Sequence, residues 1–86
     1  MEAREAYELV TTGGYVRDGY FLESCTFDEK AYYLVFSYVP EGCGKMIPPG
    51  GGLAFAVSKG DGGISRIGIP SREFFRVCSL PEVSVA

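Results

Sequence analysis

Residues 53–77 read LAFAVSKGDGGISRIGIPSREFFRV and combine two alternating apolar runs with a glycine-rich turn between them. Asp61-Gly62 in that turn supplies the positive φ values that a tight connection between two twisted strands requires. Ser71 then stands where a helix N-cap is expected, just before an aromatic segment. The stretch therefore predicts an antiparallel hairpin followed by a short helix.

The preceding half of the chain predicts a helix and a second hairpin. Ala3, Ala6, Tyr7 and Val10 follow the i, i+3, i+4, i+7 spacing of one helical face. Two segments rich in tyrosine, phenylalanine and valine follow, and such residues are typical of strands. The expected elements are a helix at 2–11, strands at 20–27, 31–39, 53–57 and 64–69, and a short helix from Ser71 to before Pro81.

We predict the α+β class: an N-terminal helix packed on a four-stranded antiparallel sheet of two hairpins, with a short C-terminal helix, in one domain at 1–86. The strand at 31–39 is apolar on both faces, so each face needs a cover. The N-terminal helix covers one face, and either the segment around Phe74 or a second copy of the protein covers the other. Period-two alternation places Phe21 and Cys25 on one side of the first strand and Leu22 on the opposite side. The tail at 82–86 either adds an edge strand or is loose.

Size and charge exclude several classes of function. The 86 residues carry a net charge of −3, with −5 in residues 1–41 and +2 in residues 42–86. An acidic surface repels phosphate backbones, so we expect no nucleic-acid binding. No apolar run approaches the length that spans a bilayer, and we expect no membrane contact. Three cysteines without a paired spacing, and no apolar leader, predict a reduced, cytoplasmic protein.

The chain offers little reactive chemistry. Histidine is absent, which removes the usual general base and the commonest metal ligand. Cys25 and Cys78 lie in apolar patterns typical of buried, inert thiols. Cys43 lies beside Lys45 between two glycines, but no phosphate-loop motif follows. We therefore predict a protein that is not an enzyme, with no catalytic residues, no metal site and no cofactor.

A partner-binding surface is expected around residues 40–52. This segment contains five glycines and three prolines, and loops of that length are usually functional or disordered. Met46 and Ile47 give it apolar side chains that a pure spacer would not need; packing back on the core is the alternative explanation. The predicted contact residues are Glu23, Tyr38, Glu41, Met46 and Ile47.

Several short stretches resemble the small bacterial immunity proteins of polymorphic toxin systems, in particular the immunity protein 35 family. The resemblance is carried by YYLVF at 32–36, AFAVSK at 54–59, DGGI at 61–64 and GIPS at 68–71. The chain departs from that family in its PPGGG segment and in having Tyr32 where tryptophan is frequent. The resemblance implies a protein that binds and neutralises a cognate toxin.

Such a role suits the residues, because aromatic side chains supply contact energy and acidic groups steer a basic partner such as a nuclease. Two alternatives stay open. One is a phage or mobile-element inhibitor of a host defence system. The other is a structural domain that forms a homodimer through its doubly apolar strand.

Overall fold

The computed structural model describes residues 1–16, 18–38, 52–69 and 71–85, with the side chain of Tyr38 excepted. It confirms the predicted α+β class, with an N-terminal helix, a four-stranded antiparallel sheet and a short C-terminal helix. The expected loop at 40–52 lies outside the described residues, apart from Gly52. The elements are α1 (Ala3–Thr12), β1 (Tyr20–Phe27), β2 (Ala31–Tyr38), β3 (Leu53–Ser58), β4 (Ile64–Ile67) and α2 (Arg72–Cys78).

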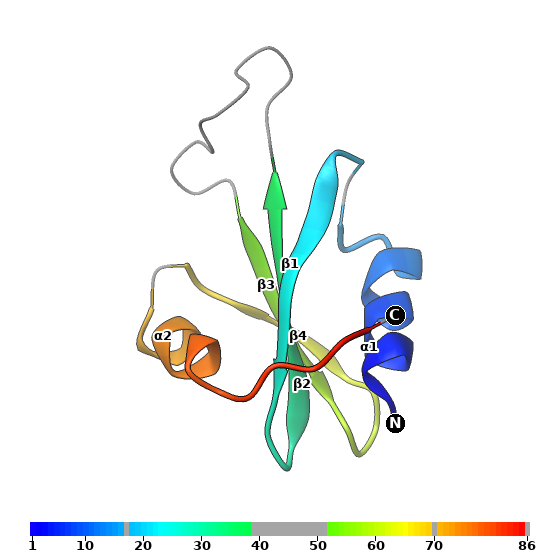
Figure 1. Cartoon of the computed structure of the whole chain (residues 1–86). Helices are drawn as coiled ribbons and strands as arrows, with labels where there is room; N and C mark the ends of the chain where they lie inside the picture. Colours follow the sequence, from blue (N-terminus) through cyan, green and yellow to red (C-terminus); the bar gives the residue numbers. More distant parts are fainter. Residues whose placement is uncertain (17, 39–51, 70, 86) are drawn as a thin grey trace.

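The four strands form a meander in the order β1-β2-β3-β4, with every pair antiparallel (Figure 1). Local hydrogen bonds shape the two tight turns. Asp28 Oδ1 accepts from the amides of Lys30 at 2.8 Å and Ala31 at 2.9 Å, and Asp61 Oδ1 accepts from the amide of Gly63 at 2.8 Å. In the second turn only Gly62 has a positive φ, 74°, whereas we expected it of Asp61 as well. A single glycine thus supplies the left-handed conformation there.

The helices lie on opposite faces of the sheet, which gives the protein three layers (Figure 1). The α1 side contains Phe36, Leu34 and Val57, each at most 1% exposed. The α2 side is smaller and is centred on Ala54 and Val77, both fully buried. Each apolar face of β2 therefore has its own helical cover, which answers the question that the sequence left open between a helix and a second copy.

A capping box at its start and one apolar face at helical spacing explain why α1 forms. Glu2 and Glu5 exchange side-chain and backbone hydrogen bonds at its start, and its own residues Ala3, Ala6 and Val10 are buried against the sheet. Small alanines let the helix approach the sheet closely.

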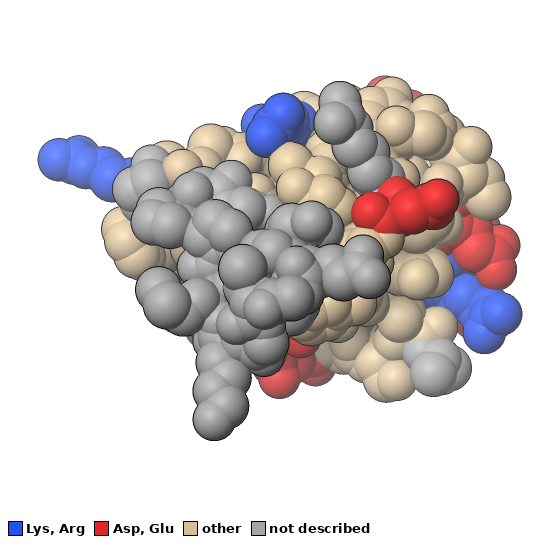
Figure 2. All heavy atoms as spheres, turned by 90° about the horizontal axis from the view of Figure 1, so that it is seen from above, with Lys and Arg blue, Asp and Glu red and all other residues tan. Residues whose placement is uncertain are grey.

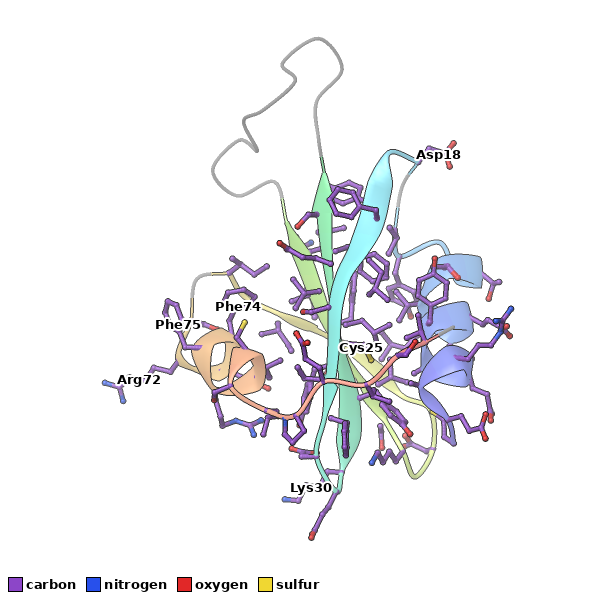
Figure 3. The ribbon with its side chains drawn as sticks, in the orientation of Figure 1. Asp18, Cys25, Lys30, Arg72, Phe74 and Phe75 are labelled. Atoms are coloured by element: carbon purple, nitrogen blue, oxygen red, sulfur yellow. The ribbon has the colours of Figure 1, made fainter. Side chains whose placement is uncertain are left out.

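Ser71 caps α2, since its Oγ accepts from the Phe74 amide at 3.1 Å. Val77 is fully buried and Phe74 is half-buried, so one side of this two-turn helix closes the second face. Phe75 lies on the outer side of α2 and is 65% exposed (Figure 3). Cys78 is exposed too, so the expectation of a buried thiol at that position is wrong.

A β-bulge at Glu23 changes which residues of β1 face each helix. Leu22 pairs with Phe36 and Ser24 pairs with Val35, so Glu23 is the extra residue and the alternation shifts by one. Leu22 and Cys25 therefore both pack on the α1 side, while Phe21 lies opposite Ser37 and is 48% exposed. The prediction that put Phe21 and Cys25 on one face is wrong, because strict alternation does not hold across a bulge.

Candidate partner-binding surface

The C-terminal tail crosses the edge of the sheet and reaches α1. The amide of Phe27 donates to Pro81 O at 3.2 Å, and the amide of Val83 donates to Cys25 O at 2.9 Å. An antiparallel bridge joins Thr26 to Glu82. Beyond these contacts the tail turns from β1 towards α1 (Figure 1). The tail therefore adds no full edge strand to the sheet but is held on β1 by an isolated bridge, which lies between the two expectations for this segment.

Three neighbouring hollows surround this tail, with volumes of about 400, 260 and 330 Å³. Val85 lines all three, while Leu22 and Val83 each line two. We call them together the tail groove, because the tail passes between them. Its apolar floor consists of Tyr7, Leu22, Tyr32, Val83 and Val85.

The local fold explains why this floor is apolar. The bulge turns Leu22 towards α1, and Tyr7 packs on Phe36 with ring centroids 6.1 Å apart. Val83 and Val85 are half-buried against the same α1-side core. The groove thus exposes the rim of the larger hydrophobic cluster.

Aromatic contacts anchor the lower end of the groove. Tyr32 Oη donates to Met1 O at 3.0 Å, which ties the start of α1 to β2. The Lys59 ammonium lies 4.7 Å from the Tyr32 ring centroid and 5.0 Å from that of Phe27. A cation at that distance is attracted to the face of an aromatic ring, so Lys59 stabilises both side chains.

The groove lining is acidic. In the described part of the chain, five charged residues line it, and their formal charges give −3. The carboxylate of Glu23 is bonded to Ser37 on the opposite face of the sheet, so the other four residues leave −2 at the groove. The charged residues are Glu2, Arg4, Glu8, Glu23 and Glu82.

The basic group of this set is already paired. Arg4 Nε lies 3.1 Å from Glu8 Oε1, one helical turn away, and the two side chains are 68% and 57% exposed. Exposed pairs of this kind contribute little to stability, so Arg4 and Glu8 can change partners at low cost.

Charge also separates the two sides of the molecule at its upper end. Figure 2 shows acidic atoms gathered on the side where α1 lies, with some basic atoms among them, while basic side chains project on the side of α2. Arg72 points away from the sheet and Asp18 lies at the upper end near the start of β1 (Figure 3). The uneven distribution of charge between the two halves of the sequence is thus partly reproduced as a difference between two sides of the molecule.

The predicted contact residues are only partly placed. Glu23 lines the tail groove, and one of its carboxylate oxygens accepts a hydrogen bond from Ser37 Oγ. Tyr38 ends β2, and its backbone pairs with Tyr20. Glu41, Met46 and Ile47 lie outside the described residues, so their role stays a prediction.

Sequence reasoning missed most of the groove. Leu22 was placed on the wrong face because the bulge is invisible to a period-two pattern. The tail Glu82-Val83-Ser84-Val85 does alternate polar and apolar residues, and that pattern could have indicated a segment with one buried side. Its proximity to α1 depends on a long-range contact that no local pattern records.

A second polar cluster joins α2 to the first hairpin. Tyr33 Oη donates to Asp28 Oδ2 at 2.7 Å, and Arg76 Nη1 lies 3.5 Å from the same oxygen. The Tyr33 hydroxyl, together with two backbone amides and Arg76, lowers the pKa of Asp28 to about 2, while burial raises the pKa of Tyr33. These groups satisfy one another, which indicates a structural clamp that holds α2 on the sheet.

The described residues place no group of three or more potential metal ligands together. No helix within the described ranges is both long and apolar enough to cross a bilayer.

No family model, curated protein or solved structure matches the chain. The resemblance to immunity protein 35 therefore remains a prediction from the sequence.

Proposed function

We propose that this protein is a non-catalytic protein-binding domain of the immunity type, which neutralises a cognate toxin by covering part of its surface. The observation that supports this most is the tail groove, where an apolar floor is rimmed by carboxylates. Protein interfaces are typically built from apolar and aromatic anchors with a polar rim. Acidic groups around the anchor would steer a basic partner to the site.

The chemistry of the remaining groups agrees with a binding role. The strongest polar cluster, Asp28 with Tyr33 and Arg76, is engaged in holding α2. Burial raises the pKa of the Cys25 thiol to about 11, which keeps it protonated and unreactive near neutral pH. Neither the Asp28 cluster nor the Cys25 thiol forms a nucleophile beside a base.

Affinity purification from the native host, at low ionic strength, tests the proposal. We expect a basic protein to co-elute and to be released by salt, because exposed charge pairs are screened. Recovery of no protein partner under these conditions would count against the immunity-type role. A toxin gene next to the coding gene would support it, whereas phage structural genes would favour an inhibitor of host defence.

A homodimer would have to use another surface than the doubly apolar strand, because α1 and α2 cover the two faces of β2. Phe75 is 65% exposed on the outer side of α2 and stacks edge to face on Phe74, with centroids 5.9 Å apart. Exposed aromatic side chains of this kind are frequent at interfaces. Sedimentation of the wild type and of Phe75→Ser separates a homodimer from a monomer that binds another protein. A dimer that the substitution dissociates would assign the Phe75 surface to self-association.

A further inference from the structure

We propose that the tail groove docks a lysine- or arginine-containing segment of a partner protein, with one apolar side chain of that segment inserted between α1 and the tail. This inference rests on the proposed protein-binding function and specifies its surface and the chemistry of the partner. The occupant follows from charge complementarity. Among the described residues, the carboxylates of Glu2, Glu8 and Glu82 and one guanidinium lie at the groove, so a basic segment matches it and an acidic or phosphorylated one is repelled.

The largest hollow gives the position of the apolar anchor. It measures about 400 Å³ and is lined by Tyr7, Leu22 and Val85, with Arg4 and Glu8 at its edge. These apolar groups belong to the rim of the α1-side core and are half-buried. A leucine or tryptophan side chain placed there extends the core and removes its exposed rim from water.

The edge of β1 does not favour addition of a partner strand. The tail already pairs with Cys25 and Phe27, and the bulge at Glu23 breaks the regular spacing of the strand above them. Bulges and covering segments are known ways of protecting a sheet edge from pairing. Recognition at this edge therefore proceeds through side chains in the groove.

The ion pair of Arg4 and Glu8 predicts that loss of a basic side chain from the groove strengthens binding. Arg4 occupies Glu8 Oε1 at 3.1 Å and is the one basic side chain among the described groove residues. A basic partner must compete with it for the same carboxylate. Arg4→Gln should therefore strengthen binding of a basic segment, whereas removal of a basic side chain from most interfaces weakens binding.

The probe for the test is the peptide Lys-Lys-Leu-Trp-Lys-Lys, added to the ¹³C,¹⁵N-labelled protein and followed by NMR. We expect the largest shifts at the methyl groups of Leu22, Val83 and Val85, and binding that weakens as salt is raised from low to physiological ionic strength. The control peptide Glu-Glu-Leu-Trp-Glu-Glu should leave these methyl signals unchanged. Absence of shifts with millimolar lysine peptide, or shifts centred elsewhere, would overturn the inference.

A charge-matched pair of variants separates the groove from general electrostatics. Glu8→Gln with Glu82→Gln removes two exposed carboxylates of the groove, and Glu29→Gln with Glu73→Gln removes two exposed carboxylates outside it. We expect the first double variant to weaken the peptide about tenfold and the second to weaken it less than about twofold. Arg4→Gln should bind about twofold or more tightly. Equal losses in both double variants would show that net charge alone attracts the peptide.

Two further outcomes separate this inference from the proposed function. If Glu8→Gln with Glu82→Gln still captures the same native partner as the wild type, the groove assignment fails while the protein-binding function stands. If the methyl signals of the groove shift with protein concentration alone, the occupant is a second copy of this chain, and a basic partner segment is excluded.

Discussion

Asp28 connects three parts of the chain through one carboxylate. Its Oδ1 accepts from two amides of the β1–β2 turn, and its Oδ2 accepts from Tyr33 and faces Arg76 of α2. The pKa of this group falls from an ordinary 3.8 to about 2, first because Tyr33 donates to it. A carboxyl with a lowered pKa in the folded state contributes stability that is complete above its unfolded pKa and is lost as the pH falls towards 2.

We therefore expect Asp28→Asn to reduce the free energy of unfolding at pH 7 by about 1 kcal/mol, a value reduced for partial solvent exposure. Asparagine keeps the Oδ1 acceptor for the turn but loses the charge. The loss of stability between pH 4 and pH 2 should be shallower in this variant than in the wild type. Urea unfolding across that range measures both effects, and Glu29→Gln, which removes the same charge one residue away, serves as the control. A variant with the pH dependence of the wild type would contradict the role of Asp28.

The two described cysteines should differ strongly in reactivity. Cys25 points from β1 towards α1 and is 3% exposed, and burial raises the pKa of its thiol to about 11, whereas Cys78 is exposed on α2 (Figure 3). In a Cys43→Ser background, iodoacetamide at pH 7.5 should modify Cys78 at least about a hundredfold faster than Cys25, because the thiolate is the reactive form. Mass spectrometry of timed samples gives both rates. In urea the two rates should converge, and comparable rates in the native protein would contradict the burial of Cys25.

At the scale of an element, the bulge in β1 assigns Leu22 and Phe21 different roles. Leu22 packs on the α1-side core and Phe21 is 48% exposed on the other face. We expect Leu22→Ala to cost about 2 kcal/mol of unfolding free energy, and Phe21→Ala to cost less than about 1 kcal/mol. Chemical denaturation of the two variants checks this ranking. A larger loss of stability in Phe21→Ala than in Leu22→Ala would contradict the bulge and support the strict alternation expected from the sequence.

The bounds of the elements were predictable because they depend on local signals. Ser71 as N-cap, Asp28 in the first turn and Gly62 in the second all act within a few residues, and each has its expected place in the structure. The short edge strand β4 ends at Ile67, two residues before the expected end, and Gly68 follows it directly. The alternation of Ile67 and Ile69 suggested a longer strand, but the glycine between them marks where the strand ends.

The candidate site was less predictable, because its geometry depends on contacts between distant residues. Glu23 stays a predicted contact residue. Leu22, in contrast, is turned by the bulge, and Val85 reaches α1 only through pairing of the tail with β1. The exposure of Cys78 has a similar origin, since a two-turn helix buries a single side and Val77 occupies it. Apolar character alone does not reveal which side that is.

At the scale of the whole molecule, the three-layer arrangement predicts that the central strands are more stable against local opening than the edge strand β4 and α2. β2 and β3 lie inside the sheet and contact helices or core residues on both faces, whereas β4 is a short edge strand with Ser65 and Arg66 exposed. The amides of Leu34 and Phe55 should exchange only on global unfolding, while those of β4 and α2 exchange through local opening. Native-state hydrogen exchange followed by NMR tests this order. Equal protection of β4 and β2 would indicate a single cooperative unit.

The tail should open as a separate unit of this hierarchy. Two backbone hydrogen bonds, from Phe27 to Pro81 and from Val83 to Cys25, hold it on β1, and Val85 packs its outer part on the α1-side core. Val85→Ser weakens that packing and leaves the sheet intact, so the amides of Phe27 and Val83 should exchange about tenfold faster while Leu34 changes little. Ser65→Ala, an exposed change on the opposite edge, should leave all three rates as they are. If Leu34 accelerates together with the tail, the tail belongs to the global folding unit, and any partner that displaces it would have to unfold the sheet.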